Sequence, residues 1–418
     1  MRSGYELYVG IDWASEAHRV CVIDPECRML HDRTIEHAGS AIQEFLDWLA
    51  TLTGGHSGRA AVAIEIPRGA LVESLVERGF AVFFINPKQL DRFRDRHTVA
   101  GAKDDRRDAL VLADSLRTDE ACFRRVRIDD PRIIQIRELS RMDEDLGQEA
   151  NRLANRLREQ LHRFYPQMLR LNPAADESWL WSLVELAPTP VQGARLSPKR
   201  VERLLREHRI RRFKASDVVA ELRQPSLRVA PGTVEAGVLH IAMLVPRLRL
   251  MQAQRAECTK RMESLLESFE GDPGQNNEHH DVEILRSLPG VGRVVAATVL
   301  AEAFQPLAER DYHALRSFAG TAPVTNQSGK RRGVTMRRAC NRRLRNAVYH
   351  WARVAAQHDP RAREIYKALR ARGHTHGRAL RQLADRLLAI LVAMLLSGTL
   401  YDPNRARRVP AGARAAAI

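Results

Sequence analysis

The chain has 418 residues, which is long enough for two or three domains that each bury a core and excludes a single small module. Its 67 Lys and Arg residues against 51 Asp and Glu give a formal net charge of +16 and an isoelectric point of about 10.3. This charge favours a polyanionic partner such as nucleic acid. A GC-rich genome can also produce an arginine-rich composition, so charge alone does not decide the function.

The cysteines and apolar runs predict a protein of the reducing cytosol. There are 5 cysteines, odd in number and without a Cys-x-x-Cys pair, which argues against a disulfide framework or a zinc site. The N-terminus lacks the layout of a signal peptide. The apolar run at 384–396 is too short to span a bilayer and contains Asp385 and Arg386. We therefore predict a soluble, cytoplasmic protein with no membrane partner.

Residues 6–36 alternate short β-rich runs with turn residues, which predicts three antiparallel strands. The pattern next predicts a helix over 41–52, a strand over 61–64, a helix over 69–78, a strand over 81–85 and a helix over 104–116. This order of elements is that of an RNase H-like fold. We therefore predict an α/β, RNase H-like domain over residues 1–125.

Four carboxylates of this domain are candidates for a metal site. Asp12 and Glu65 each end a predicted strand, and Asp105 and Asp108 are three apart in a predicted helix and so share a face. Such a sheet would bring all four to one edge. Clustered carboxylates repel one another unless a cation neutralises them, and hard oxygen ligands suit Mg²⁺ or Mn²⁺. This arrangement predicts two-metal phosphodiester chemistry.

Residues 126–280 are predicted to form a helical linker. Apolar residues repeat at helical spacing over 133–164 and again over 234–269, and a smaller helical insertion with a basic stretch at 199–214 lies between them. The two runs could form an intramolecular αα-hairpin or a dimerising coiled coil, and the sequence leaves both open. Residues 271–280, rich in Gly, Pro and Asn, read as a connecting segment.

A second, all-helical domain is predicted over residues 281–402, followed by a basic disordered tail over 403–418. Near its start, Leu288-Pro289-Gly290-Val291-Gly292 precedes an apolar helix and resembles a helix-hairpin-helix turn. Backbone N–H groups at Gly290 and Gly292 could bind a phosphate at a helix N-terminus. A plain tight turn between two core helices would look the same.

Ser328 lies in a small-residue segment just before a dense basic run. On composition alone it could bind phosphate, cap a helix or attack phosphorus, and the first two are favoured because a hydroxyl needs activation. The neighbouring basic residues are candidate nucleic-acid contacts, although they could also form a solvated face. They are Lys330, Arg331, Arg332, Arg337, Arg338 and Arg342.

Taken together, five segments resemble the signature blocks of the DEDD transposases of the insertion-sequence-110 type, in the same order and spread over nearly the whole chain. They are Gly10-Ile11-Asp12-Trp13-Ala14, Ile64-Glu65, Lys103-Asp104-Asp105-Arg106-Arg107-Asp108-Ala109, Leu288-Pro289-Gly290-Val291-Gly292 and Gln327-Ser328-Gly329-Lys330. The family usually has Thr or Ser where this chain has Asp104. Helix spacing cannot choose between Asp104 and Asp105 as the ligand, and the family's Lys-x-Asp-x-x-Asp-Ala pattern selects Asp105.

The resemblance implies a RuvC-like N-terminal domain, an oligomerising helical linker and a C-terminal transposase domain. By the same resemblance, Asp12, Glu65, Asp105 and Asp108 would bind Mg²⁺, and Ser328 would form a covalent link to DNA. It also implies a non-coding bridge RNA that pairs with donor and target DNA, and a dimer or tetramer whose active sites join domains of different protomers. The arginine surplus fits a protein that contacts the phosphates of both nucleic acids.

Two other functions remain open. A metal-dependent structure-specific nuclease, such as a Holliday-junction resolvase, would use the four carboxylates and water without Ser328. A nucleic-acid-binding protein that has lost catalysis would be expected to lack part of the carboxylate set, which this chain retains. His18, His374 and His376 are left out of the site, because a histidine in a basic helix more often contacts phosphate or solvent than a metal.

Overall fold

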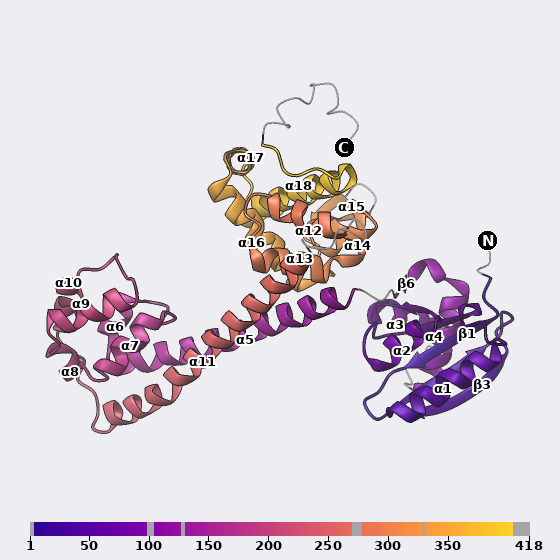
Figure 1. The fold of residues 1–418 in the computed structure, drawn as a ribbon, viewed down its shortest axis with the longest axis horizontal. Coiled ribbons are helices and arrows are strands. Elements are labelled where there is room, and N and C mark those ends of the chain that lie inside the picture. Colours follow the sequence, from indigo (N-terminus) through magenta and orange to yellow (C-terminus); the bar gives the residue numbers. More distant parts are fainter. Residues whose placement is uncertain (1–3, 98–103, 127–129, 270–277, 329–330, 404–418) are drawn as a thin grey trace. The chain divides into compact units, whose positions relative to one another are not determined.

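The computed structural model describes residues 4–97, 104–126, 130–269, 278–328 and 331–403, with the backbone alone at 87, 88, 97, 278–280, 331 and 332. The chain divides into two compact units, Met1–Asp130 and Pro131–Ile418 (Figure 1). The predicted domain boundaries at 125, 280 and 402 stay predictions.

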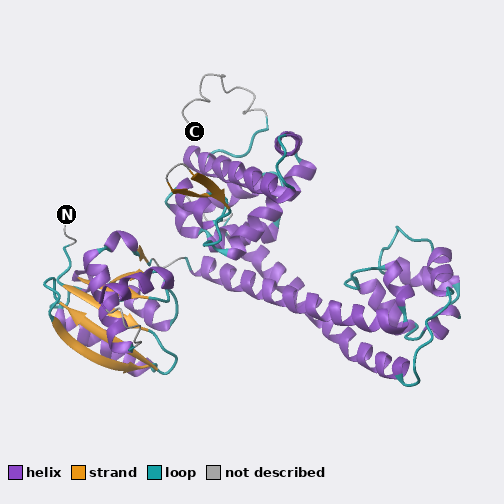
Figure 2. Cartoon of the chain, turned by 180° about the vertical axis from the view of Figure 1, so that it is seen from behind, coloured by secondary structure: helices purple, strands orange, loops and turns teal. Residues whose placement is uncertain are grey.

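The first unit contains a mixed β-sheet, whose strands are orange in Figure 2. The sheet has six strands in the order β3-β2-β1-β4-β5-β6. The first three strands pair antiparallel, β4 and β5 run parallel to β1, and β6 pairs antiparallel with β5. The predicted α/β architecture is therefore confirmed. The elements are β1 (Leu7–Asp12), β2 (Ala17–Ile23), β3 (Met29–Glu36), α1 (Gly39–Leu52), β4 (Ala60–Ile64), α2 (Ala70–Glu77), β5 (Ala81–Phe84), α3 (Pro87–His97), α4 (Asp105–Thr118) and β6 (Arg124–Arg125), with 3-10 turns at Ser57–Arg59 and Glu120–Cys122.

Strand β1 separates two hydrophobic cores. Val9 and Ile11 face the core formed with α1 and α2, and Tyr8 faces the core formed with α3 and α4. Gly10 also lies on the α4 side, because a Cβ there would come within 1.9 Å of the carbonyl oxygen of Ala109. Only glycine lets α4 approach β1 this closely. This contact places the first turns of α4 directly over the end of β1.

The second unit is organised by two long helices, α5 (Pro131–Phe164) and α11 (Thr233–Ser268). They lie side by side and antiparallel, with Arg132 at the start of α5 donating a hydrogen bond to the carbonyl of Ser268 at the end of α11, 3.2 Å away (Figure 1). The two predicted long helices are therefore present, and they pair within one chain. Whether a second protomer also packs on them stays a prediction.

The two ends of this helix pair belong to different hydrophobic cores. One core joins α5 residues from Leu153 to Phe164 with the insertion between the long helices. The other joins Ile133 and Ile136 of α5, and Met262 and Leu266 of α11, with the C-terminal helices. The insertion helices are α6 (Pro166–Leu171), α7 (Ser178–Leu186), α8 (Pro190–Ala194), α9 (Pro198–Glu207) and α10 (Ala215–Leu222).

The C-terminal part of the second unit is mainly helical but contains a β-hairpin that the sequence analysis missed. The prediction of an all-helical domain was wrong over residues 324–335, where two strands pair antiparallel from Val324 opposite Thr335 to Ser328 opposite Arg331. The β-branched pairs Val324-Thr325 and Val334-Thr335 lie opposite each other at one end of the hairpin, and such residues favour strands. The elements are α12 (Glu278–Ser287), α13 (Arg293–Glu302), α14 (Phe304–Ala308), α15 (Tyr312–Phe318), β7 (Val324–Ser328), β8 (Arg331–Thr335), α16 (Arg342–His358), α17 (Pro360–Ala371) and α18 (His376–Ser397).

Three further differences from the sequence expectations concern local elements. Helix α3 was not predicted, because Pro87 at its first position and its many charged residues resemble a turn. Residues 278–280 belong to α12, although the sequence placed them in a connecting segment. The predicted basic tail lies outside the described residues from 404 onward. The apolar run of α18 packs into the C-terminal core, and no described helix is long and apolar enough to cross a membrane.

Candidate active site

Asp12 and Glu65 lie at the same edge of the sheet. Asp12 is the last residue of β1, and Glu65 directly follows β4. The two strands are parallel neighbours with Ile11 opposite Ile64, so the two carboxylates occupy the next register position. Because Ile11 and Ile64 face the core under α1 and α2, strand alternation directs Asp12 and Glu65 toward the face covered by α4. Both residues are half-buried.

The first turn of α4 contributes the other two candidates. Asp105 is the first helical residue and is exposed, whereas Asp108 is only 3% exposed. Asp104 is the N-cap, and its carboxylate accepts a hydrogen bond from the backbone N–H of Arg106 at 3.2 Å. Asp104 therefore has a structural role as a helix cap, and the assignment of Asp105 as the ligand stays a prediction.

The buried carboxylate of Asp108 is paired with an arginine that the sequence analysis missed. Arg94 of α3 binds it through both oxygens, with Nε 2.7 Å from Oδ1 and Nη2 2.9 Å from Oδ2. Arg94 also contacts Asp91, with Nη1 2.6 Å from Oδ1. A bidentate guanidinium compensates the buried negative charge. Nothing in the sequence indicated this role for Arg94, because Arg94 and its partner lie in different helices and meet only in the folded domain.

A second ion-pair group holds the start of α4 on the sheet. Asp32 of β3 lies 2.7 Å from Arg19 of β2 and 2.6 Å from Arg106 of α4. Arg19 is the register partner of Asp12, so this group lies beside the candidate site. The ion pairs and the close packing at Gly10 fix the first turn of α4 against β1 and β2.

The donor set fits a hard divalent cation, since all four candidates are carboxylates. Among the residues that the structure describes, however, no three Asp, Glu, His or Cys side chains are close enough together to hold a metal ion. The pairing of Asp108 with Arg94 is one physical reason, because both of its oxygens are already occupied. The assignment of the four carboxylates as metal ligands thus stays a prediction.

Two buried side chains of β2 were left out of the predicted site. Burial, reinforced by the charge of Asp32, raises the pKa of the Cys21 thiol to about 12, so it stays protonated. His18 is fully buried, and its Nε2 lies 2.9 Å from Nδ1 of His37. Burial and then the charge of His37 lower the pKa of His18. One ring nitrogen of His18 is thus engaged by His37, and its exclusion from the site stays a prediction.

Ser328 lies in the second unit, as the last residue of β7. It is exposed and pairs in register with Arg331 of β8. The sequence predicted a loop at Ser328. In the structure this residue instead ends a strand, and its side chain is exposed on the β7–β8 hairpin. Lys330 lies outside the described residues, and only the backbone of Arg331 and Arg332 is described.

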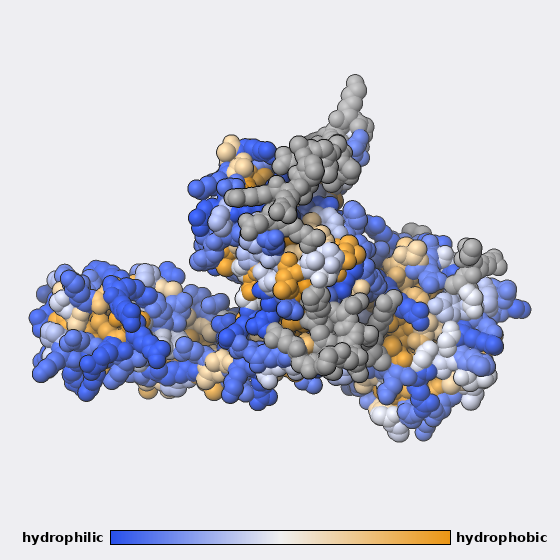
Figure 3. Space-filling model, turned by 45° about the horizontal axis from the view of Figure 1, so that its top comes forward, coloured by the Kyte–Doolittle hydropathy of each residue, from blue (hydrophilic) through white to orange (hydrophobic). Residues whose placement is uncertain are grey.

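The other predicted basic contacts differ in their surroundings. Arg338 and Arg342 are exposed, as a contact to nucleic acid requires. Arg337 is half-buried, and its Nε has no hydrogen-bond partner among the described residues. In contrast, Arg343 is paired with Glu144 of α5 at 2.7 Å. The visible face in Figure 3 is covered mainly by hydrophilic side chains, and which of these bind nucleic acid stays a prediction.

The turn between α12 and α13 has a packing role. Gly290 has a positive φ of 84°, and a Cβ there would come within 2.7 Å of the backbone nitrogen of Ala355 in α16. Trp351 of α16 donates a hydrogen bond from Nε1 to the carbonyl of Pro289 at 2.9 Å. Gly292, at the N-cap of α13, is exposed with open space around it. Gly292 is therefore the better placed of the two predicted phosphate contacts.

Comparison with known proteins adds the family context. Residues 9–166 match the transposase family of the DEDD IS110 type, and residues 282–367 match the transposase IS116/IS110/IS902 family. The mini-circle protein of IS117 from Streptomyces coelicolor is 33% identical over 408 residues, which cover 96% of each chain. The 43.6 kDa protein of insertion element IS110 from the same organism is 30% identical over 98% of each chain. The y4uE protein of Sinorhizobium fredii is 50% identical over 209 residues, which cover 50% of this chain and 58% of that protein.

Proposed function

The chain belongs to the IS110 family of DNA transposases, and from this premise we propose that it cuts and rejoins DNA by means of a serine nucleophile and a carboxylate-bound cation. The transposed DNA is that of an insertion sequence. The observation that carries the proposal is the parallel pairing of β1 with β4, which sets Asp12 and Glu65 side by side under α4. The order of the strands, with α4 packed across β1, supports the assignment of an RNase H-like, RuvC-like domain.

The four carboxylates Asp12, Glu65, Asp105 and Asp108 would hold Mg²⁺ or Mn²⁺. Such a cation, when bound, offsets the negative charge that develops on the phosphate and lowers the pKa of an attacking hydroxyl. The protein itself positions the carboxylates of α4. The Arg106–Asp32 ion pair and the contact of Ala109 with Gly10 hold the start of this helix on the sheet. A change in the Arg94–Asp108 pair would free the Asp108 oxygens for a cation.

Ser328 would act as the nucleophile. Its Oγ forms a bond to the scissile phosphorus while the bond from phosphorus to one DNA oxygen breaks, and that oxygen leaves as a strand-end hydroxyl. A hydroxyl at the end of another DNA strand then attacks the phosphorus of the phosphoserine. A new phosphodiester bond forms, the bond from phosphorus to the serine oxygen breaks, and the serine hydroxyl is regenerated. The phosphodiester bond energy is conserved, so strand transfer needs no nucleotide cofactor. The exposed position of Ser328 on the β7–β8 hairpin is consistent with access to DNA.

Guidance by a structured bridge RNA and assembly into a dimer or tetramer complete the proposal. The net charge of +16 suits a protein that neutralises phosphates of both RNA and DNA. The α5–α11 pair offers a long helical surface for an oligomer contact, in the manner of a coiled coil. Sequencing the RNA that co-purifies with the protein tests guidance, since a guide should map to non-coding DNA beside the gene.

A cleavage assay on the DNA of the element's ends separates this function from a hydrolytic nuclease. We expect Asp12→Ala and Ser328→Ala each to abolish strand transfer, and Thr325→Ala, on the same strand as Ser328, to retain it. Cleavage that persists in Ser328→Ala and is lost in Asp12→Ala would instead establish a metal-dependent nuclease that uses water.

A further inference from the structure

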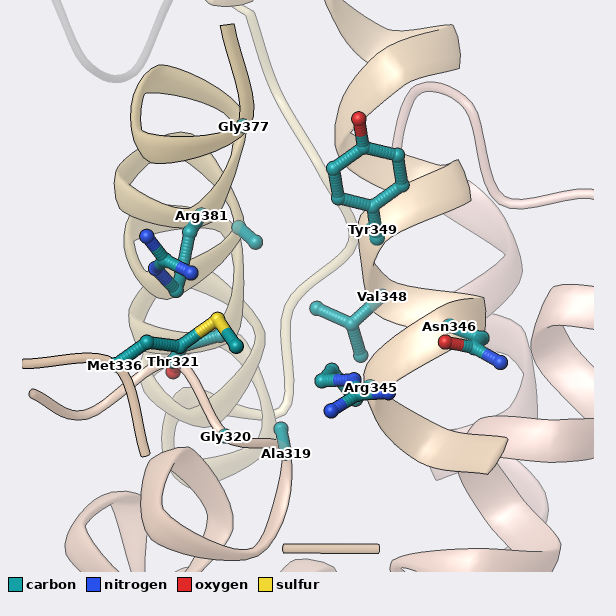
Figure 4. A pocket seen from close by; sticks show the side chains of 11 residues that line it. Ala319, Gly320, Thr321, Met336, Arg345, Asn346, Val348, Tyr349, Gly377 and Arg381 are labelled. Atoms are coloured by element: carbon teal, nitrogen blue, oxygen red, sulfur yellow. The ribbon is translucent and has the colours of Figure 1, made fainter. Parts of the chain in front are cut away.

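A cavity of about 360 Å³ opens in the second unit between α16 and α18 (Figure 4). Helix α16 contributes Arg345, Val348 and Tyr349, and α18 contributes Gly377 and Arg381. The loop after α15 closes one end, and Met336, the residue after β8, lies at its side. This volume lies in the range of pockets that take small organic ligands.

The cavity carries positive charge without a compensating acid. Among the described residues, neither Arg345 nor Arg381 forms an ion pair with a carboxylate. Asp385, one turn along α18 from Arg381, is instead bound by Arg316 at 2.6 Å and by the Thr321 hydroxyl at 2.8 Å. Burial, followed by the positive charge of Arg378, lowers the pKa of Arg381. Two partly buried guanidinium groups beside one cavity favour an anionic ligand.

Much of the remaining lining is apolar and includes one aromatic ring, while Thr321 and Asn346 add polar side chains. Val348, Tyr349 and Met336 present hydrocarbon, ring and thioether surfaces to the cavity (Figure 4). A free phosphate would leave this surface uncovered, whereas a nucleotide has a flat base for the apolar part and a phosphate for the arginines. Bases taken out of a stack commonly pack against aromatic side chains.

The cavity lies at the base of the hairpin that carries Ser328. Thr335, next to Met336, pairs with Val324, and Ser328 lies four residues further along β7. At about 3.4 Å per residue the hydroxyl is about 14 Å along the strand from the cavity end. A DNA strand that passes Ser328 can therefore also reach the cavity.

We propose that this cavity takes one unstacked nucleotide of the DNA strand that Ser328 attacks, with the base against Val348 and Tyr349 and the phosphate on Arg345 and Arg381. The identity of that strand rests on the proposed function, but nucleotide binding does not require catalysis. The site would hold the strand in register while the serine acts.

Photo-crosslinking of the full-length protein tests the site. Single-stranded DNA that carries 5-iododeoxyuridine is irradiated with the protein, and crosslinked peptides are identified by mass spectrometry; RNA of the same sequence with 5-iodouridine forms a second arm. We expect DNA crosslinks at Tyr349 or Met336. Crosslinks only elsewhere in the chain would overturn the proposal, and crosslinks at these residues with RNA alone would overturn the assignment to DNA.

A cavity-filling variant makes the test specific. A Cβ at Gly377 would meet no atom within 4 Å, so Gly377→Leu should fold and project its side chain into the open space. We expect it to lose the crosslink and to bind DNA about tenfold more weakly, whereas Gly377→Ala keeps both. Arg386→Gln removes an exposed charge from the same helix outside the cavity and should keep the crosslink.

Two further variants separate the possible failures. If Gly377→Leu does not fold, Arg381→Gln supplies the second test, with an expected several-fold loss of crosslinking. Ser328→Ala should keep the crosslink. An intact crosslink without any covalent serine–DNA adduct would therefore contradict the proposed function alone, and an adduct without a crosslink would contradict the cavity alone. A crosslink that survives Gly377→Leu would also overturn the cavity assignment.

Discussion

The two units hold their candidate catalytic residues in opposite ways. In the first unit, Asp12, Glu65 and Asp108 are at least half-buried, and the backbone around them is fixed by the close contact of α4 with β1. In the second unit, Ser328 is exposed on a two-stranded hairpin that carries arginines. The first arrangement suits a site that must hold several charges at fixed distances. The second suits a hydroxyl that must meet a large substrate.

The surroundings of the two candidate sites differ in charge, although arginines pair with acids in both units. Arginines of the first unit compensate acids, as Arg94 does for Asp108 and Arg106 does for Asp32. In the second unit, Arg345 and Arg381 line a cavity without a described carboxylate partner. A cation would therefore find its ligands in the first unit and a phosphate in the second. Substitutions in each unit test this contrast.

The sharpest test within the first unit compares two adjacent acids. We expect Asp105→Asn to lower strand cleavage by at least about a hundredfold, because it would remove a ligand of the proposed cation. Asp104→Asn should stay within about threefold of the wild type, since Asn caps a helix as well as Asp does. Initial cleavage rates of the two variants measure the difference. Equal losses would contradict the assignment of Asp105.

The second unit offers a matched pair of glycines. Gly290→Ala should lower the free energy of unfolding by about 2–4 kcal/mol, because alanine at positive φ is strained and its Cβ would clash with α16. Gly292→Ala should lower it by less than about 1 kcal/mol, since its surroundings are open. Urea denaturation measures both. Weaker DNA binding by a stable Gly292→Ala protein would support the predicted phosphate contact at this turn.

Arg94 tests charge compensation in the first unit. Arg94→Gln leaves the Asp108 carboxylate buried and unpaired, and we expect a loss of about 2 kcal/mol without metal, less than for a fully buried pair because the Arg94 side chain is 25% exposed. The same variant should bind Mn²⁺ more tightly and regain part of its stability when Mn²⁺ is added. Denaturation with and without Mn²⁺ measures both effects.

The control for Arg94 is Arg96→Gln, which breaks a surface pair with Asp119 whose side chains are 56% and 39% exposed. Its loss should be less than about 0.5 kcal/mol, with no change in Mn²⁺ response. If Mn²⁺ stabilises Arg94→Gln no more than the wild type, the Asp108 carboxylate is not a metal ligand.

The smallest expected effect is a pH dependence in the second unit. Burial alone would raise the pKa of Glu302, but hydrogen bonds from Arg141 and Asn341 outweigh it and hold the pKa below the ordinary value of 4.5. Glu302 therefore stabilises the fold above pH 4.5, and this contribution is lost as the pH falls through the lower folded pKa. Glu302→Gln should flatten this acid dependence, and substitution of the exposed Glu364 should leave it unchanged.

Much of the first unit could be predicted from sequence because its signals are local. Apolar strands that end in Asp12 and Glu65, and a helix that begins near Asp105, are each visible within a few residues. Parallel pairing then brings strand ends to one edge. Arg94 could not be predicted, since its role depends on a contact between helices α3 and α4.

In the second unit, the long helices were visible because their apolar period extends over more than thirty residues, 34 in α5 and 36 in α11. The hairpin around Ser328 was missed because its strands have 5 residues each and are largely polar. The cavity was also beyond sequence reasoning, since α16, α18 and the hairpin meet there only in the folded unit.

The most direct test of the central claim is the chemistry of Ser328. The protein, with its co-purified RNA and a divalent cation, is incubated with DNA of the element's ends, and its peptides are analysed by mass spectrometry. The account predicts a nucleotide joined to Ser328 through a phosphoserine bond in the wild type, and none in Asp12→Ala. Cleaved DNA with no nucleotide on Ser328, or a nucleotide on another side chain, would contradict it.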